Sequence, residues 1–125
     1  MDTGDKKTIN CFEDLEIWKM GMRISVKIYE IMKNNKDYGL KDQMQRAAVS
    51  VPSNIAEGFE QQTNKEFIQF LYIAKGSCGE LRTQLYLAKE LNYIDKEDYT
   101  NLLNNTKSLS AMIYRFIETR KRGQI

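Results

Sequence analysis

Apolar residues recur at alternating spacings of four and three, without interruption, from residue 67 to residue 88. An α-helix places residues with this spacing on one face, whereas a β-strand would place every second residue on one face. A seam of about three heptads is typical of a long helix that packs against other helices. The sequence has a single proline, which argues against a turn-rich β fold. The seam comprises Phe67, Leu71, Ala74, Cys78, Leu81, Leu85 and Ala88.

Two segments before this seam also carry helical spacing. The first helix is expected at about residues 13–34, with Asn10 as its N-cap. The second runs over residues 40–59, and we expect Gly39 to precede it in a left-handed conformation. Pro52 lies in its middle, and the apolar spacing continues in phase through this proline. We therefore expect one helix with a kink at Pro52 rather than two separate helices.

Capping residues place the last two helices. Thr63 and Glu66 have the spacing of a capping box for the third helix, and Asp95 is the expected N-cap of the fourth. Connections of roughly four to six residues make sequential helices antiparallel neighbours. The sequence therefore predicts an all-α fold, an antiparallel up-down four-helix bundle with a Pro-kinked second helix. The expected bounds are an N-terminal extension at 1–11, the bundle domain at 12–120 and a short basic tail at 121–125.

Two glycines, Gly76 and Gly79, interrupt the third helix. A glycine inside a helix costs about 1 kcal/mol relative to alanine. We therefore expect another backbone to pass close to them, with the first helix as the candidate.

The first helix has more apolar surface than one core needs. Its polar arc covers only roughly 80°, and an exposed apolar side of that size favours aggregation unless a partner covers it. A second copy is the simplest partner, so we expect a ring-like homo-oligomer. One apolar side comprises Leu15, Trp18, Met22, Val26 and Tyr29. The other side, our candidate oligomer interface, comprises Ile17, Met20, Ile24, Ile28 and Ile31.

Residues that carry most enzyme chemistry are missing from the sequence. There is no His, the commonest general base and metal ligand, and no Gly-rich phosphate loop, paired-Cys metal motif or nucleophile elbow. Cys11 and Cys78 are far apart, and we expect reduced thiols. Neither a membrane span nor a signal peptide is recognisable. We expect a cytoplasmic, non-enzymatic protein without cofactor, metal or membrane.

The net charge of +2 is not that of a protein that coats nucleic acid. Local basic patches are nevertheless candidates for phosphate contacts. Each has a structural alternative: Glu16 and Glu30 flank the cations of the first helix at pairing distance, and the last cations complement the dipole of the fourth helix. The candidate nucleic-acid-binding residues are Lys19, Arg23, Lys27, Arg46, Arg120, Lys121 and Arg122.

A polar face of the second helix lies opposite its apolar stripe. It offers either a binding surface or a structural network, in which Ser hydroxyls and Arg46 pair with the carbonyls freed by Pro52 and with acids such as Glu80. We favour the network. Its expected members are Arg46, Ser50, Ser53, Asn54, Glu57 and Glu80.

Three segments resemble one bacterial family: MQRAAVSVPSNIAEGF at 44–59, KEFIQFLYIAKGSCGELRTQLYLAKELNYI at 65–94 and FEDLEIWKMG at 12–21. The family is named after the protein encoded in intervening sequences of large-subunit ribosomal RNA genes. The resemblance implies a four-helix bundle that assembles into a ring-like homopentamer. A similar protein, the accessory variability determinant of diversity-generating retroelements, is a basic pentamer that binds nucleic acid and a reverse transcriptase. This chain departs from the family pattern at Glu60 and Gln61, where members often carry Gly-Arg.

Together these features give one functional hypothesis and one alternative. The hypothesis is a non-enzymatic homo-oligomer, pentameric by resemblance, that serves as an accessory or scaffold protein. It would bind structured RNA, a ribonucleoprotein or another nucleic-acid-associated protein through basic patches, by Coulombic attraction rather than base reading. The alternative is a protein–protein interaction module with no nucleic-acid role.

Overall fold

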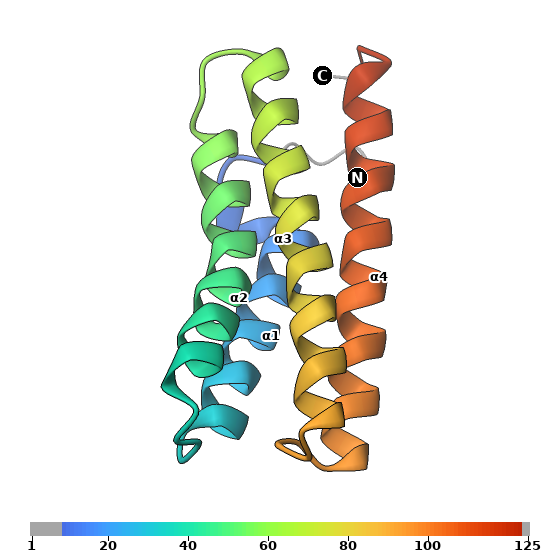
Figure 1. Ribbon diagram of the computed structural model, residues 1–125. Helices are drawn as coiled ribbons and strands as arrows, with labels where there is room; N and C mark the ends of the chain where they lie inside the picture. Colours follow the sequence, from blue (N-terminus) through green and yellow to red (C-terminus); the bar gives the residue numbers. More distant parts are fainter. Residues whose placement is uncertain (1–8, 124–125) are drawn as a thin grey trace.

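Four α-helices and one short 3-10 helix make up residues 9–123, the part of the chain that the computed structural model describes, and this part contains no β-strand. The elements are η2 (Phe12–Asp14), α1 (Glu16–Met32), α2 (Tyr38–Phe59), α3 (Asn64–Glu90) and α4 (Lys96–Lys121). The four long helices lie side by side and alternate in direction (Figure 1). The predicted all-α fold of four helices is confirmed. The outer parts of the expected N-terminal extension and basic tail lie outside the described residues.

Side-chain caps fix where three helices begin. Asp37 accepts a backbone hydrogen bond from the first turn of α2 at 3.1 Å. Thr63 and Glu66 form the predicted capping box before α3. The predicted cap Asp95 accepts a backbone hydrogen bond from the first turn of α4 at 2.8 Å. The expected break at Gly39 is wrong: Gly39 lies in the first turn of α2 without a positive φ, because Asp37 caps the helix earlier.

The start of α1 also differs from the prediction. The helix begins at Glu16, and Asn10 does not cap it. Residues 12–14 form a 3-10 turn instead, and an extended Leu15 (φ −76°, ψ 128°) separates this turn from α1. The Leu15 side chain is buried in the core. The backbone is therefore not helical at Leu15, the residue whose side chain enters the core.

The core lies between the four helices. Each helix packs against two others, in the order α1, α2, α3, α4 and back to α1, and α1 and α4 pack least closely. Within residues 9–123 the backbones of the two diagonal pairs do not come close to each other. Burying a large aliphatic side chain stabilises the fold by about 1.5–3 kcal/mol, and every helix contributes several. The largest fully buried apolar side chains are Ile28, Met32, Met44, Ile55, Leu71, Leu81, Leu85, Leu102, Leu109, Ile113 and Ile117.

Helix α2 continues through Pro52 as a single element, while the expected kink stays a prediction. Proline has no N–H, so it cannot donate to the carbonyl of Ala48 four residues earlier. Ser25 of α1 supplies a donor instead, because its Oγ lies 3.0 Å from the Ala48 oxygen and 2.9 Å from the Gly21 oxygen. Gly21 gives α2 room, since a Cβ there would lie 3.2 Å from Pro52 Cδ.

The close approach expected at Gly76 and Gly79 is wrong. A Cβ at either position would meet nothing within 4 Å in the described part of the chain, because both glycines lie away from the neighbouring helices. The tight contact of this kind lies at Gly58 of α2, where a Cβ would come 2.6 Å from Phe70 Cβ of α3.

Candidate nucleic-acid interface

A groove runs between α1 and α4, the two neighbouring helices that pack least closely. Two open pockets lie along it. One, of about 330 Å³, is at the start of α1. The other, of about 420 Å³, is near the middle of α1 and faces the first half of α4. We call these two pockets together the α1–α4 groove.

The middle pocket combines cations and amides. Arg23 and Lys27 line it from α1, and Asn101 and Asn105 line it from α4. Guanidinium, ammonium and amide N–H groups all donate hydrogen bonds, and the amides also accept them. Such a set suits a phosphate oxygen far better than an apolar ligand. The remaining lining is apolar and comprises Met20, Ile24 and Leu102.

Arg23 differs from the other two cations of α1, because both of those form ion pairs with acids of the described part of the chain and Arg23 does not. Lys19 and Lys27 each pair with an acid of their own helix, at 3.5 and 3.9 Å, as the flanking glutamates predicted. Lys27 also pairs with Asp98 of α4 at 3.4 Å. Arg23 is exposed and makes no ion pair within residues 9–123. Exposed ion pairs contribute little stability, so a phosphate can compete for Lys27, while Arg23 is free to bind one.

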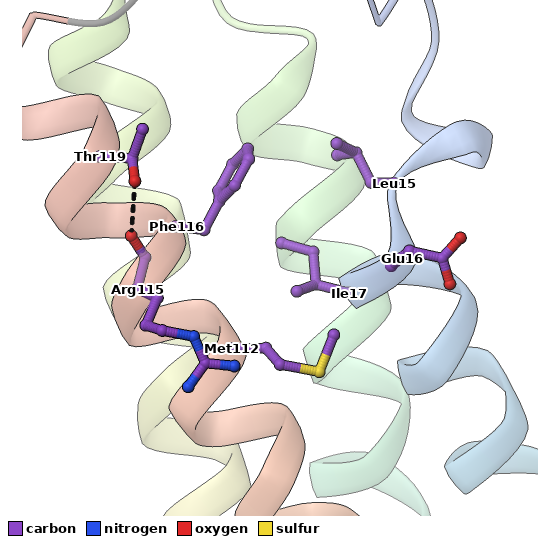
Figure 2. A pocket seen from close by; sticks show the side chains of 7 residues that line it. All are labelled: Leu15, Glu16, Ile17, Met112, Arg115, Phe116 and Thr119. Atoms are coloured by element: carbon purple, nitrogen blue, oxygen red, sulfur yellow. Dashed lines mark hydrogen bonds between the residues drawn. The ribbon is translucent and has the colours of Figure 1, made fainter. Parts of the chain in front are cut away.

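The pocket at the start of α1 is mainly apolar (Figure 2). Side chains from both helices point into the space between α1 and α4, while Glu16 points away from it. On the α4 side, Thr119 Oγ1 donates to the carbonyl of Arg115 at 3.0 Å. No pair of acids faces this pocket, so it offers contact surface rather than acid–base chemistry. The apolar lining comprises Leu15, Ile17, Met112 and Phe116.

Arg120, one of the candidate phosphate ligands, is half-buried and held by contacts within the fold. Its Nε donates to Asn64 Oδ1 at 2.8 Å, and Asn64 Nδ2 donates to the Arg120 carbonyl at 2.9 Å. The guanidinium lies 4.9 Å from the ring centre of Phe67 and 5.6 Å from that of Phe116. Burial lowers the pKa of Arg120. These contacts join the start of α3 to the end of α4 and favour a structural role.

The remaining candidate cations lie elsewhere. Lys121 is the last residue of α4 and pairs with Glu118 at 3.7 Å, and Arg122 is the C-cap. Arg46 is exposed on α2, where its Nε donates to Asp42 Oδ2 at 3.0 Å. Lys121, Arg122 and Arg46 do not line the α1–α4 groove. Of the predicted set, Arg23 and Lys27 therefore meet in the α1–α4 groove, whereas Arg120 and Lys121 line a separate pocket between the start of α3 and the end of α4.

The polar network predicted on α2 forms in part. The hydroxyls of Ser50 and Ser77 lie 2.8 Å apart, and Asn54 Nδ2 donates to both the carbonyl and the hydroxyl of Ser50. The expected pairing of Arg46 with Glu80 is wrong, because an acid one turn away on α2 is its partner. Three expected members are exposed and make no side-chain hydrogen bond within residues 9–123: Ser53, Glu57 and Glu80.

The candidate oligomer interface needs a correction. Three of its five members are buried inside this chain, with Ile17, Ile24 and Ile28 at 5%, 4% and 0% exposure. The other two, Met20 and Ile31, are partly buried against the same core. Packing of α2 and α4 on this side of α1 consumes the surface expected to face a second copy. The side that stays exposed carries Met22, Val26 and Tyr29.

Sequence reasoning missed the amides of the groove. Asn101 and Asn105 lie four residues apart in α4, which places them on one face of the helix. That spacing shows that the two amides share a face of α4. The apolar seam of α4 does not show that this face lies beside α1 rather than α3. Arg115 was missed for the same reason.

Two absences concern residues 9–123. No cluster of three or more His, Cys, Asp or Glu side chains there has an arrangement that could hold a metal ion. No helix of this region combines the length and apolarity needed to cross a membrane.

Burial raises the pKa of Cys78 to about 11, so its thiol stays protonated at neutral pH.

Comparisons with known proteins identify relatives of this architecture. The family model described as 23S rRNA-intervening sequence protein matches residues 13–115. A crystal structure from Bacteroides thetaiotaomicron VPI-5482, of a protein of unknown function in the S23 ribosomal protein family, has a similar fold. The TM-score is 0.77 at 24% sequence identity, over 82% of this chain and 99% of that chain. No curated protein matches the sequence.

Proposed function

Because the chain belongs to the 23S rRNA-intervening sequence protein family, we propose that it is a non-enzymatic accessory protein that binds structured RNA in the α1–α4 groove. The observation that carries this proposal is Arg23, an exposed cation that makes no ion pair with any residue from 9 to 123. It lines the same pocket as Lys27, Asn101 and Asn105. The proposal places the protein in the cytoplasm.

Phosphate recognition in the groove follows from the chemistry of these side chains. A guanidinium matches two phosphate oxygens with parallel hydrogen bonds, so Arg23 is the anchor. Lys27 adds a second positive charge after exchanging its ion pairs with Glu30 and Asp98 for a phosphate. The two asparagines donate neutral hydrogen bonds that orient the strand. Such contacts fix position on an RNA backbone and do not read its bases.

Self-association is the second part of the proposal. The side of α1 with Met22, Val26 and Tyr29 is 40%, 53% and 49% exposed, and a second copy would cover it. In the ring of five implied by the family resemblance, each copy presents its own groove, so several weak phosphate sites act on one RNA at once. Sedimentation at rising protein concentration tests this part. We expect Val26→Glu to lower the mass to that of one chain, and a single-chain mass for the unchanged protein contradicts it.

The RNA proposal is tested with a structured ribosomal RNA fragment over a salt series. Phosphate neutralisation makes the logarithm of affinity fall linearly with the logarithm of salt concentration. We expect Arg23→Glu with Lys27→Glu to abolish binding at moderate salt. The control Arg46→Glu, compared with the single variant Arg23→Glu, reverses one exposed charge outside the groove and should leave most of the affinity intact. Equal losses in the groove variant and the control contradict the assignment of the groove.

A protein–protein interaction module is the second candidate function. The apolar side of α1 favours it, because exposed apolar patches mark protein interaction sites. Absence of RNA binding even at low salt, combined with normal folding, supports this candidate over the first.

A further inference from the structure

Half-exposed tyrosines alternate with lysines along the outer seam between α3 and α4. Tyr72 and Tyr86 are each 45% exposed, and Tyr114 is 50% exposed. A lysine or another tyrosine from the facing helix contacts each of them. We call this surface the tyrosine–lysine strip. It comprises Tyr72, Lys75, Tyr86 and Lys89 of α3 with Tyr99, Tyr114 and Lys121 of α4.

Two contacts between lysines and tyrosine rings order the first half of the strip. Lys121 Nζ lies 5.7 Å from the ring centre of Tyr72 and donates to its hydroxyl at 3.1 Å. Lys75 Nζ lies 5.9 Å from the ring centre of Tyr114. Both contacts cross from one helix to the other, so each ring is held beside a cation. One acid shares this region, since Glu118 pairs with Lys121 at 3.7 Å.

The second half of the strip repeats the arrangement. Tyr86 meets Tyr99 of α4 with ring centres 6.5 Å apart, and Lys89 Nζ lies 5.3 Å from the Tyr99 ring centre. Tyr72 and Tyr86 are fourteen residues apart on α3, which corresponds to about 21 Å along a helix. The strip is therefore long enough for several nucleotides.

Space for a ligand exists between the two halves and at one end. Gly76 and Gly79 lie between Tyr72 and Tyr86 in the sequence, and a Cβ on either glycine would meet nothing within 4 Å. Packing of this chain thus does not require glycine there, although glycine is unfavourable in a helix interior. At the Tyr72 end a pocket of about 490 Å³ opens beside the ring, lined also by Lys65, Ile68, Gln69 and Lys121.

We propose that the tyrosine–lysine strip binds single-stranded RNA, with unpaired bases stacked on the tyrosine rings and phosphates neutralised by the lysines. This inference rests on the proposed function in taking RNA as the partner, but it assigns a second surface on the opposite side of α4 from the groove. Every base has a flat π-face, and sequence-tolerant single-strand binding uses this combination of exposed aromatic rings and cations. A duplex hides its base faces, so the strip selects unpaired segments of a structured RNA.

The probe is a fluorescently labelled twelve-nucleotide oligouridine, with binding to the full chain followed by anisotropy. We expect Tyr72→Leu with Tyr114→Leu to weaken binding by at least about thirtyfold, because base stacking on each ring is lost. Tyr72→Phe with Tyr114→Phe keeps the rings and should stay within about threefold of the unchanged protein. The control Tyr38→Leu removes a ring that is 68% exposed at the start of α2, away from the strip, and should have no effect.

Lysine variants test the phosphate contacts separately. Replacing Lys75 and Lys121 by Gln should reduce the slope of log affinity against log salt by about 1.4, at about 0.7 per single-strand phosphate. Circular dichroism of each variant verifies that it folds. No oligouridine binding by the folded, unchanged protein overturns the inference, as does an equal loss in the Leu and Phe double variants. If the strip binds a protein partner instead, the unchanged protein does not bind oligouridine.

The strip and the groove can fail independently. If structured RNA binds and Arg23→Glu with Lys27→Glu abolishes that binding, while oligouridine does not bind, the groove assignment stands and the strip assignment falls. If oligouridine binds and depends on the tyrosines, while the groove variant binds structured RNA normally, the strip stands and the groove assignment falls.

Discussion

The contact between Ser25 and the Ala48 carbonyl yields a prediction that a double-mutant cycle can test. Pro52 leaves the Ala48 oxygen without its helical donor, and Ser25 Oγ lies 3.0 Å from that oxygen. Replacing Ser25 by Ala leaves a buried carbonyl without a partner. Replacing Pro52 by Ala as well restores the N–H that donates to Ala48 within α2. The effect of Ser25→Ala on the free energy of unfolding should therefore depend on residue 52.

The expected magnitude follows from the burial of the site. Ser25 and Ala48 are 6% and 1% exposed, so water does not replace the lost donor. An unsatisfied buried carbonyl costs about 1–3 kcal/mol, and we expect Ser25→Ala to destabilise the unchanged background by about 1.5 kcal/mol. In the Pro52→Ala background the loss should fall to about 0.5 kcal/mol or less, because the second acceptor, the Gly21 oxygen, already has its helical donor. The coupling energy is thus about 1 kcal/mol.

Urea unfolding followed by circular dichroism measures all four proteins. All are compared at one protein concentration, because self-association would shift the apparent stability. A loss of about 1.5 kcal/mol moves the midpoint by about 1 M when the m-value is near 1.5 kcal/mol/M. Ser110→Ala is the control, since this serine is 8% exposed on α4 and should behave the same in both backgrounds. Equal midpoint shifts for Ser25→Ala in both backgrounds would refute the reasoning.

Three further predictions concern stability and reactivity. Gly79→Ala should raise the free energy of unfolding by up to about 1 kcal/mol, because the new Cβ meets open space. Gly58→Ala should lower the free energy of unfolding by about 1–3 kcal/mol, because its Cβ would overlap α3. Urea midpoints of the two variants that shift in the same direction contradict this prediction. Cys78, with a pKa of about 11, should resist iodoacetamide at pH 8 until the chain unfolds, as mass spectrometry of native and unfolded protein will show. The hydrogen bond from Tyr93 to Asp37 raises the pKa of the phenol, so this contribution to stability is complete below pH 10 and is lost as the pH rises through the folded-state pKa. Tyr93→Phe should remove that alkaline loss from the pH dependence of the unfolding midpoint.

Periodicity and capping predicted the helices because both depend on residues close together in the sequence. The seam beginning at Phe67 is buried as expected, and Thr63 and Asp95 cap the helices that they were expected to begin. The first helix was placed too early, because Leu15 adopts an extended backbone to enter the core. Nothing in local spacing distinguishes that geometry from a helical first turn.

The candidate site was harder to predict, since it depends on which flank of one helix faces another. Arg23 and Lys27 were recognised as a basic stripe, but their neighbours Asn101 and Asn105 belong to a helix more than seventy residues later. Ser25 was missed because it lies on α1, and no local pattern shows that a hydroxyl of one helix reaches a carbonyl of another. Helix α1 does keep exposed apolar residues after the bundle has formed, as its wide apolar surface predicted. The side assigned to a second copy, however, is the side that this chain buries.

The α1–α4 groove joins the two ends of the helical sequence. The other three neighbouring pairs are linked by connections of four or five residues, whereas closing α1 on α4 fixes a loop that contains both central helices. Loop-closure entropy is therefore largest for this seam, and its packing is the loosest. Hydrogen exchange should reveal α1 as the first helix to detach in local unfolding. An anion that binds both helices would stabilise their contact. Its binding free energy would then add to the free energy needed to detach α1 from the bundle.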